Sequence, residues 1–559
     1  MQANSYDVVV VGSGAGGGMA AYMLTRAGAR VVVLEAGPLW WPEEDSAMWT
    51  WNYQSARRGG GTRLRPFGEF DAGDGGWDIE GEPYTRAPGT TFDWYRGRML
   101  GGRTNHWGRI SLRFGPDDFR RRSLDGLGDD WPIGYHDLKP FYDQVDRLIG
   151  IFGSVEGLPN EPDGIFLPPP EPRCWEHLVQ GASDRIGLTC IPSRLSILTT
   201  PHNGRPACHY CGQCNRGCKA NANFSSPGVL LRPAMETGLL TIIPLAMARE
   251  VVTRPDGRAR GVGYIDKTTG EDRMVEGRVV VLAASACESA RMLLNSKSSR
   301  HPNGLANGSG VVGKYLTDTV GADMGAYLPR MEEWVPHNCD GVGGAHKYMP
   351  WTTDNRKLDF PRGYHIEIWG GHGMPGAGAM GGIQNYPVGG GYGQPLKDAY
   401  RKYYGTMIGF SGRGEQIPNE DCWCEIDPKV VDQWGIPVLR FHWKWAEHEI
   451  RQARHMQQTF AALIEQLGGT PLWSAGAESD WGIAAGGRII HELGTVRMGD
   501  DPDTSVVDRW CRAHEVPNLF VADGGPFVSQ ADKNPTWTIL ALSMRTSDHI
   551  AQAMKRGEL

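Results

Sequence analysis

No run of apolar residues in this 559-residue chain reaches the roughly 18 needed to cross a membrane. The chain also has no strong excess of one charge. It has 57 basic and 64 acidic side chains, for a formal net charge of -7. This balance gives no reason to expect nucleic acid or an anionic membrane surface as a partner. The sequence has no C-x-x-C-H haem motif and no internal repeat. Its first residues lead directly into a β-branched run, so we expect no secretory signal on this chain.

The paired cysteines of a disulfide scaffold are also lacking. The chain has 11 cysteines, and the seven outside one compact run are scattered along it. An odd remainder in a large chain argues against a disulfide framework, and we expect these residues to be small buried thiols. The scattered cysteines are Cys174, Cys190, Cys287, Cys339, Cys422, Cys424 and Cys511.

The other four cysteines, Cys208, Cys211, Cys214 and Cys218, have the spacing C-x2-C-x2-C-x3-C. Each short gap turns the next sulfur back toward the same point, which favours an iron–sulfur cluster of the 3Fe-4S or 4Fe-4S kind. Structural zinc more often uses two separated pairs of ligands, and cysteines kept only for packing are the remaining alternative. The run differs from the bacterial ferredoxin pattern because Lys219, not proline, follows its last cysteine.

A dinucleotide-binding fingerprint lies near the start of the chain. Residues 8–11 predict a strand buried on both faces of a parallel sheet, and the sequence GSGAGG follows directly. Gly12 would make the tight turn, Gly14 would let the backbone approach a pyrophosphate, and Gly17 would let helix and strand pack closely. Glu35 ends the next predicted strand, where the ribose hydroxyls of a bound dinucleotide would lie. The motif alone does not separate FAD from NAD.

The remaining elements predict an α/β fold. Residues 277–282 indicate another buried strand, and residues 446–467 form an amphipathic helical pattern that ends at Gly468. The segment 158–172 is proline-rich, which is typical of a linker.

Five segments carry a resemblance to a known family. They are, in order, GSGAGGGMA, GGRTNHWG, VVVLAASACESARMLLNS, HELGTVRMG and NLFVADGGPFVSQADKNPTWTILALSMR. The chain resembles the glucose–methanol–choline (GMC) family of FAD-dependent oxidoreductases over essentially its full length. The resemblance implies that FAD lies along residues 12–17 and Glu35, with Asp523, Gly524 and Asn534 closing over the flavin end.

The resemblance also implies a domain plan. A discontinuous Rossmann-type FAD-binding domain would carry an inserted, sheet-based substrate-binding domain. The expected FAD domain comprises residues 1–110, 200–320 and 490–559, with the cysteine-rich loop at 205–220. Residues 111–199 would form an insertion, and residues 321–489 the substrate-binding domain.

Two residues match the family's catalytic pair. The family keeps its base in an H-x-x-G-T segment, where this chain has His491 in HELGT. A second His or Asn follows the closing strand, and here it is Asn534 in KNPTWT. The resemblance implies that flavin N5 takes a hydride from the alcohol carbon while neutral His491 takes the hydroxyl proton. Asn534 would donate its amide N–H to the same oxygen and orient it.

A second glycine turn, at 97–110, includes Gly102, Asn105 and His106, which we expect beside the flavin. Pyranose-oxidising members of the family carry a T-H-W segment whose histidine links covalently to the flavin ring. Here Asn105 stands between Thr104 and His106. We therefore expect a non-covalent flavin, with covalent attachment as the alternative.

The full pattern is most similar to bacterial GMC sugar dehydrogenases of the glucoside 3-dehydrogenase kind. It implies oxidation of a secondary ring hydroxyl of a sugar or glucoside, C3 favoured, to a keto-sugar, with electrons leaving through the iron–sulfur site. One alternative is a flavin-dependent pyranose or alcohol oxidase that uses O2. The other is a non-catalytic flavin and iron–sulfur electron carrier, against which the pair His491 and Asn534 argues.

The expected partners follow from the same resemblance. Related multi-subunit dehydrogenases pair a large flavin chain with a small signal-bearing subunit and often a cytochrome acceptor. We therefore expect such a small subunit to carry this chain, already folded, into the periplasm by the Tat route. It should dock near residues 205–220. A self-sufficient cytoplasmic enzyme is the alternative.

Overall fold

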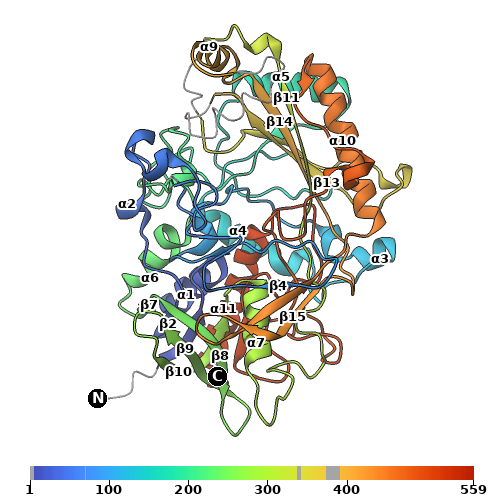
Figure 1. Ribbon diagram of the computed structural model, residues 1–559. Helices are drawn as coiled ribbons and strands as arrows, with labels where there is room; N and C mark the ends of the chain where they lie inside the picture. Colours follow the sequence, from blue (N-terminus) through green and yellow to red (C-terminus); the bar gives the residue numbers. More distant parts are fainter. Residues whose placement is uncertain (1–5, 70, 336–340, 373–390) are drawn as a thin grey trace.

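A computed structural model describes residues 6–69, 71–335, 341–372 and 391–559. Two large sheets occupy opposite ends of the molecule, and the C-terminus lies beside the first of them (Figure 1). Within the described residues, no helix is both long and apolar enough to span a bilayer.

The first sheet is built on the predicted N-terminal strand. Its order is β7-β2-β1-β10-β9-β8, with β18 paired to β10. Strands β7, β2, β1, β10 and β18 run parallel, and residues 8–11 are buried in their midst, as a β-branched strand covered on both faces should be. The strands are β1 (Tyr6–Val11), β2 (Val31–Leu34), β7 (Leu240–Ile243), β8 (Ala246–Thr253), β9 (Ala259–Asp266), β10 (Asp272–Leu282) and β18 (Leu519–Val521).

Helices cover this sheet. Helix α1 follows the glycine turn and packs against α11, which in turn contacts α4. Among the described residues, the α-helices are α1 (Ala15–Arg26), α2 (Pro42–Asp45), α3 (Arg121–Asp125), α4 (Tyr135–Ile149), α5 (Cys174–Arg185), α6 (Arg232–Met235), α7 (Ala286–Asn295), α9 (Gln394–Tyr403), α10 (Glu447–Leu467) and α11 (Thr536–Lys555). The predicted strand at 277–282 is the parallel half of β10.

The second sheet is antiparallel, in the order β17-β11-β14-β13-β12-β6. Helix α10 packs across it and contributes Met456, Phe460 and Leu463 to one buried cluster with the sheet. The helix ends where Gly468 adopts φ 67°, so the predicted helix and its glycine stop are confirmed. The strands are β6 (Ile191–Pro192), β11 (Val320–Tyr327), β12 (Lys347–Met349), β13 (Tyr364–Gly370), β14 (Met407–Gly414) and β17 (Thr470–Pro471).

Two small sheets complete the fold. In the first, β16 lies between β15 and β4, so strands from the C-terminal third of the chain meet one from its N-terminal part. The second pairs β3 with β5. Their strands are β3 (Gly75–Gly76), β4 (Thr85–Arg86), β5 (Arg96–Gly97), β15 (Trp423–Val431) and β16 (Pro437–His442). The α/β class with two sheet-based parts is confirmed, and the division into residue ranges stays a prediction.

Candidate active site

A cavity of about 600 Å³ opens at the carboxyl ends of the parallel strands β1, β2 and β10. This is where open parallel sheets bind their ligands. Gly12 turns at φ 92°, and a Cβ there would lie 2.4 Å from the carbonyl oxygen of Ala283. A Cβ on Gly17 would lie 1.9 Å from the carbonyl oxygen of Gly12, whereas a Cβ on Gly14 would meet nothing within 4 Å. Gly12 and Gly17 therefore allow close packing, and Gly14 keeps the cavity wall open.

Glu35 lines the cavity at the end of β2. Its buried carboxylate accepts hydrogen bonds from the Ser13 hydroxyl and, at 2.8 Å, from the Gly37 backbone N–H. Burial raises the pKa of Glu35, while these hydrogen bonds and the Arg98 charge oppose the rise. Ser13 also accepts from the Gly101 N–H at 2.8 Å, which ties the fingerprint loop to the second glycine turn.

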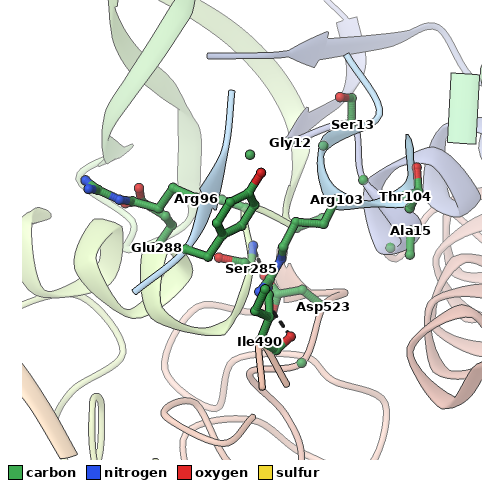
Figure 2. A pocket seen from close by; sticks show the side chains of 18 of the residues that line it. Gly12, Ser13, Ala15, Arg96, Arg103, Thr104, Ser285, Glu288, Ile490 and Asp523 are labelled. Carbon is green, nitrogen blue, oxygen red and sulfur yellow. Dashed lines mark hydrogen bonds between the residues drawn. The ribbon is translucent and has the colours of Figure 1, made fainter. Parts of the chain in front are cut away.

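Asp523 and Gly524 line the cavity beyond β18. The Asp523 carboxylate accepts from the Ser289 hydroxyl at 2.5 Å and from the backbone N–H groups of Ser285 and Gly525. Burial raises its pKa to about 6 despite these donors. Figure 2 shows Asp523 and Ser285 beside Arg103 and Ile490, with Gly12 and Ser13 on the other side of the pocket. The predicted closing residues thus share one cavity with the glycine fingerprint.

The second glycine turn forms another wall. Gly102 and His106 line the cavity, whereas Asn105 lies beneath it and donates its amide to the Leu100 carbonyl at 2.8 Å. The partly buried His106 ring contacts Phe67 and Tyr95, at centroid distances of 5.8 and 5.2 Å. Burial lowers the pKa of His106 to about 3, with the charges of Arg109 and Arg103 acting in the same direction. Its Nδ1 has no hydrogen-bond partner among the described residues.

His491 and Asn534 meet at this cavity, with Asn534 Nδ2 3.5 Å from His491 Nε2. His491 Nδ1 lies 2.9 Å from the Thr319 hydroxyl oxygen, which also accepts from Gln530 Nε2 at 2.9 Å. An N–H at Nδ1 donating to Thr319 leaves Nε2 with a free lone pair facing the Asn534 amide. Burial lowers the pKa of His491 to about 3, so the ring is neutral at physiological pH. This is the state that a proton acceptor needs.

A buried carboxylate fixes the backbone under His491. Asp318 accepts the N–H of His491 at 2.9 Å and that of Ile489 at 3.2 Å. Ile490 between them adopts φ 66°, a left-handed conformation that a β-branched residue rarely takes. Burial and the nearby Glu492 charge raise the pKa of Asp318 to about 7. Because it lies far from the HELGT segment in sequence, Asp318 escapes motif analysis.

Glu367 on β13 contacts the same pair. Its Oε1 accepts from Asn534 Nδ2 at 3.2 Å and lies 3.3 Å from His365 Nε2, while its Oε2 lies 3.4 Å from Arg413 Nε. Burial alone would raise the pKa of Glu367, but Arg413, His365 and the Asn534 amide lower it to about 2. The carboxylate is therefore charged at any working pH. The sequence signal was a single acid within the strand YHIEIWG.

The four clustered cysteines converge on one small cavity of about 10 Å³, room for about one water molecule. Burial raises the pKa of Cys208 to about 12, and the neighbouring cysteines add to the rise. The donor atoms suit an iron–sulfur cluster. Even so, no group of three or more His, Cys, Asp or Glu side chains is placed to hold a metal ion in the described ranges. The loop adjoins the main cavity through Asn215, which lines it and accepts the Ala72 N–H at 2.7 Å.

Buried Arg109, at the end of the second glycine turn, lies near the cysteines of this loop. It donates to the backbone carbonyls of Asn105, at 2.7 Å, and Trp107. Burial lowers its pKa, and the nearby Cys214 and Cys218 oppose that change. The Arg109 guanidinium is thus near both the cavity wall and the cysteines. No sequence motif revealed it.

The described residues fit a dinucleotide. The cavity runs from the glycine fingerprint and Glu35 to His491 and Asn534, and the Cβ-free face of Gly14 opens into it. An adenine dinucleotide bound in the usual way on a βαβ unit would put its reactive ring at the His491 end. Its pyrophosphate would then face the N-terminus of α1.

Comparison with known proteins agrees with this geometry. Residues 193–321 and 418–543 match the N- and C-terminal parts of the GMC oxidoreductase family, and residues 7–40 match an FAD binding domain. The chain is 31% identical to 2-methyl-1,2-propanediol dehydrogenase of Mycolicibacterium austroafricanum, over 98% of this chain and 96% of the relative. It is 26% identical to the fructose dehydrogenase large subunit of Gluconobacter japonicus, over 99% of each chain.

The fold agrees as well. Pyridoxine 4-oxidase from Mesorbium loti superposes with a TM-score of 0.65 at 17% identity, covering 98% of this chain and 99% of that one. The α/β fold, the glycine fingerprint and the matched segments lead to one assignment. The chain belongs to the GMC oxidoreductase family and is an FAD-dependent oxidoreductase.

Proposed function

We propose that this enzyme oxidises a secondary ring hydroxyl of a sugar or glucoside, with C3 favoured, to a keto-sugar. The observation that carries the chemistry is neutral His491 with its Nε2 turned to Asn534 Nδ2, 3.5 Å away. A hydroxyl oxygen entering between them would accept from Asn534 Nδ2 and release its proton to His491 Nε2. When bound, FAD supplies the acceptor for the hydride that leaves the carbon bearing this hydroxyl.

The surrounding residues prepare this step. Asp318 holds the backbone of His491, and the Asn534 amide, whose Nδ2 can only donate, favours the tautomer whose Nε2 accepts. Glu367 holds one N–H of the Asn534 amide, so the other is left to point toward the hydroxyl. Such fixed geometry lowers the entropy cost of reaching the transition state.

The substrate class rests on relatives. Besides fructose dehydrogenase, the chain is 29% identical to paromamine 6'-oxidase of Streptomyces fradiae, over 98% of this chain and 91% of the relative. C-glycoside 3-oxidase of Microbacterium trichothecenolyticum is 28% identical, but over only 53% of this chain. These names support a sugar-type substrate and include one enzyme named for position 3.

We propose the cysteine loop as the exit for electrons, by way of an iron–sulfur cluster. The support is the convergence of Cys208, Cys211, Cys214 and Cys218 beside the wall of the main cavity. A cluster would require the loop to widen, because the present space holds about one water. Iron and acid-labile sulfide in anaerobically purified protein test this directly.

A macromolecular partner beside this loop is part of the proposal. Trp49, Trp51 and Tyr53 are more than half exposed, and Trp49 stacks on His209 of the loop at 5.6 Å. Exposed aromatic side chains of this kind mark protein contacts. We propose that a small signal-bearing subunit docks here, carries the chain to the periplasm and connects it to a cytochrome-type acceptor. Pull-down from fractionated cells tests this. A lone cytoplasmic species, fully active with a soluble acceptor, would refute it.

The activity is tested with purified, FAD-loaded enzyme. Methyl glucoside, glucose and a primary alcohol are each supplied with an artificial acceptor, with and without oxygen, and products are identified by NMR. We expect a 3-keto product that forms equally well without oxygen. Oxidation only at a primary hydroxyl would refute the substrate class. Turnover that needs oxygen would instead show an oxidase.

A further inference from the structure

A second cavity, of about 400 Å³, adjoins the first. Gly108 and Ile110 line both cavities. Its volume falls in the range of roughly 300–1,000 Å³ that is usual for small-molecule sites. The FAD fingerprint and the residues that close over the flavin lie outside it, so the cofactor does not account for this space.

One face of the second sheet forms a wall of this cavity. His365, Glu367 and Trp369 alternate along β13, so their side chains share that face. Arg413 on β14 stands in register opposite His365 and lines the same cavity. The intervening Ile366 packs instead into the core under α10, and Ile368 belongs to that core and also borders the cavity. A sheet that is apolar toward its helix and polar toward a cavity presents a binding surface.

The wall begins at the catalytic pair. Glu367 accepts from Asn534 Nδ2 at 3.2 Å, and Asn534 lies 3.5 Å from His491. A ligand that reacts at His491 and extends past Glu367 therefore enters the second cavity.

Trp369 gives this cavity a fixed aromatic plane. Its indole N–H donates to the Ser411 hydroxyl at 3.1 Å, and its ring stacks on Trp473 at 6.1 Å and 15°. Gly409 stands in register with it, and a Cβ there would lie 2.1 Å from the indole. The glycine thus lets the ring lie flat on the sheet. A flat ring held on one side suits the apolar face of another ring.

Two donors that line the cavity lack acceptors. Trp175 is 2% exposed, and its Nε1 has no hydrogen-bond partner among the described residues. Arg173 Nε likewise has no hydrogen-bond partner among the residues that the structure describes. Buried donors are normally paired, so this pair calls for a ligand that brings acceptor oxygens.

We propose that the second cavity binds a second ring, the aglycone or neighbouring sugar of a glycoside. This inference rests on the proposed function, because it places the reacting ring at His491 and Asn534. Trp369 would stack on the second ring, while Trp175 and Arg173 donate to its oxygens. The enzyme is then built for a two-ring glycoside or disaccharide rather than a free monosaccharide.

The test compares two substrates that share the reacting glucosyl ring, a disaccharide and methyl glucoside, using FAD-loaded enzyme and an artificial acceptor. We expect the wild type to favour the disaccharide in kcat/KM by roughly 10–100-fold. Trp369→Ala should shrink this preference to near unity, acting mainly on KM. Trp175→Phe, which removes the N–H and keeps an aromatic ring, should lower the preference severalfold. Tyr392, 89% exposed and outside the cavity, provides the control variant Tyr392→Ala.

Equal kcat/KM for both substrates in the wild type, or a preference that survives Trp369→Ala, would overturn this inference and leave the proposed function intact. If neither substrate is oxidised, the proposed function fails. The cavity is then tested by calorimetric titration of the same holoenzyme variants with the disaccharide. Binding that Trp369→Ala does not weaken would overturn the inference in that case as well.

Discussion

At the scale of single residues, the candidate chemistry depends on His491 being neutral and correctly oriented. Burial keeps its pKa near 3, and the Asn534 amide, a donor 3.5 Å from Nε2, favours the tautomer with its N–H on Nδ1. The sequence could predict His491 and Asn534 because each lies in a contiguous motif. Glu367 and Asp318 could not be predicted in the same way, since only the fold brings them to the pair.

His491→Ala should lower kcat by roughly 10²–10⁴, the usual cost of losing a general base. FAD content should be retained, because the fingerprint and Glu35 lie at the other end of the cavity. Steady-state kinetics and the flavin-to-protein absorbance ratio measure both effects. The exposed His136 supplies the control, His136→Ala. Near-normal turnover in His491→Ala would remove it from the mechanism.

Asp318 predicts a pH-dependent stability. Its pKa rises from 3.8 to about 7 in the fold, so the folded state holds a proton that the unfolded state releases. The stability linked to this group is fully present below about pH 4 and is lost as pH rises toward 7. The Tm of the wild type minus that of Asp318→Asn should therefore decrease from pH 5 to pH 8. A difference that stays constant, or increases, would contradict this pKa.

At the scale of elements, local patterns predicted more than did the contacts between them. The β-branched strand β1 and the amphipathic helix α10 carry their own periodicity, so their positions followed from the sequence. The pairing of β15 and β16 with β4 joins residues more than 300 positions apart. The second cavity likewise arises only when β13, α5 and the cysteine loop come together. No local signal encodes such contacts.

The second glycine turn bears on how FAD is held. His106 lines the cavity with an unpaired Nδ1, but Asn105 displaces it from the T-H-W spacing of covalently linked relatives. Acid precipitation should therefore release FAD into the supernatant. Yellow colour that stays in the pellet, and is lost in His106→Ala, would show a covalent bond.

The proposed iron–sulfur site should lose its iron when one of its cysteines is replaced. Cys211→Ser should lower iron and labile sulfide per FAD, and should slow transfer to a macromolecular acceptor more than reduction of the flavin by substrate. Cys174→Ser, an exposed cysteine outside the loop, is the matched control. Zinc, or no metal, in anaerobically prepared wild type would contradict the cluster.

At the scale of the whole molecule, each of the two large sheets borders a different cavity. The parallel sheet has its carboxyl edge at the first cavity, where FAD would bind, and the antiparallel sheet lines the second cavity, which we propose for the substrate. His491 and Asn534 lie where these surfaces meet, and the cysteine loop closes one side. Substrate entry, hydride transfer and electron exit are thus assigned to adjoining parts of one molecule.

The proposed reaction removes a hydride from C3 of a glucoside while His491 takes the hydroxyl proton. Its most direct test is anaerobic mixing of FAD-loaded enzyme with a methyl glucoside deuterated at C3, followed by the bleaching of flavin absorbance. Deuterium at C3 should slow the bleaching severalfold, and deuterium at C2 or C6 should leave it unchanged. Isotope sensitivity at another carbon, or none at C3, would contradict the account.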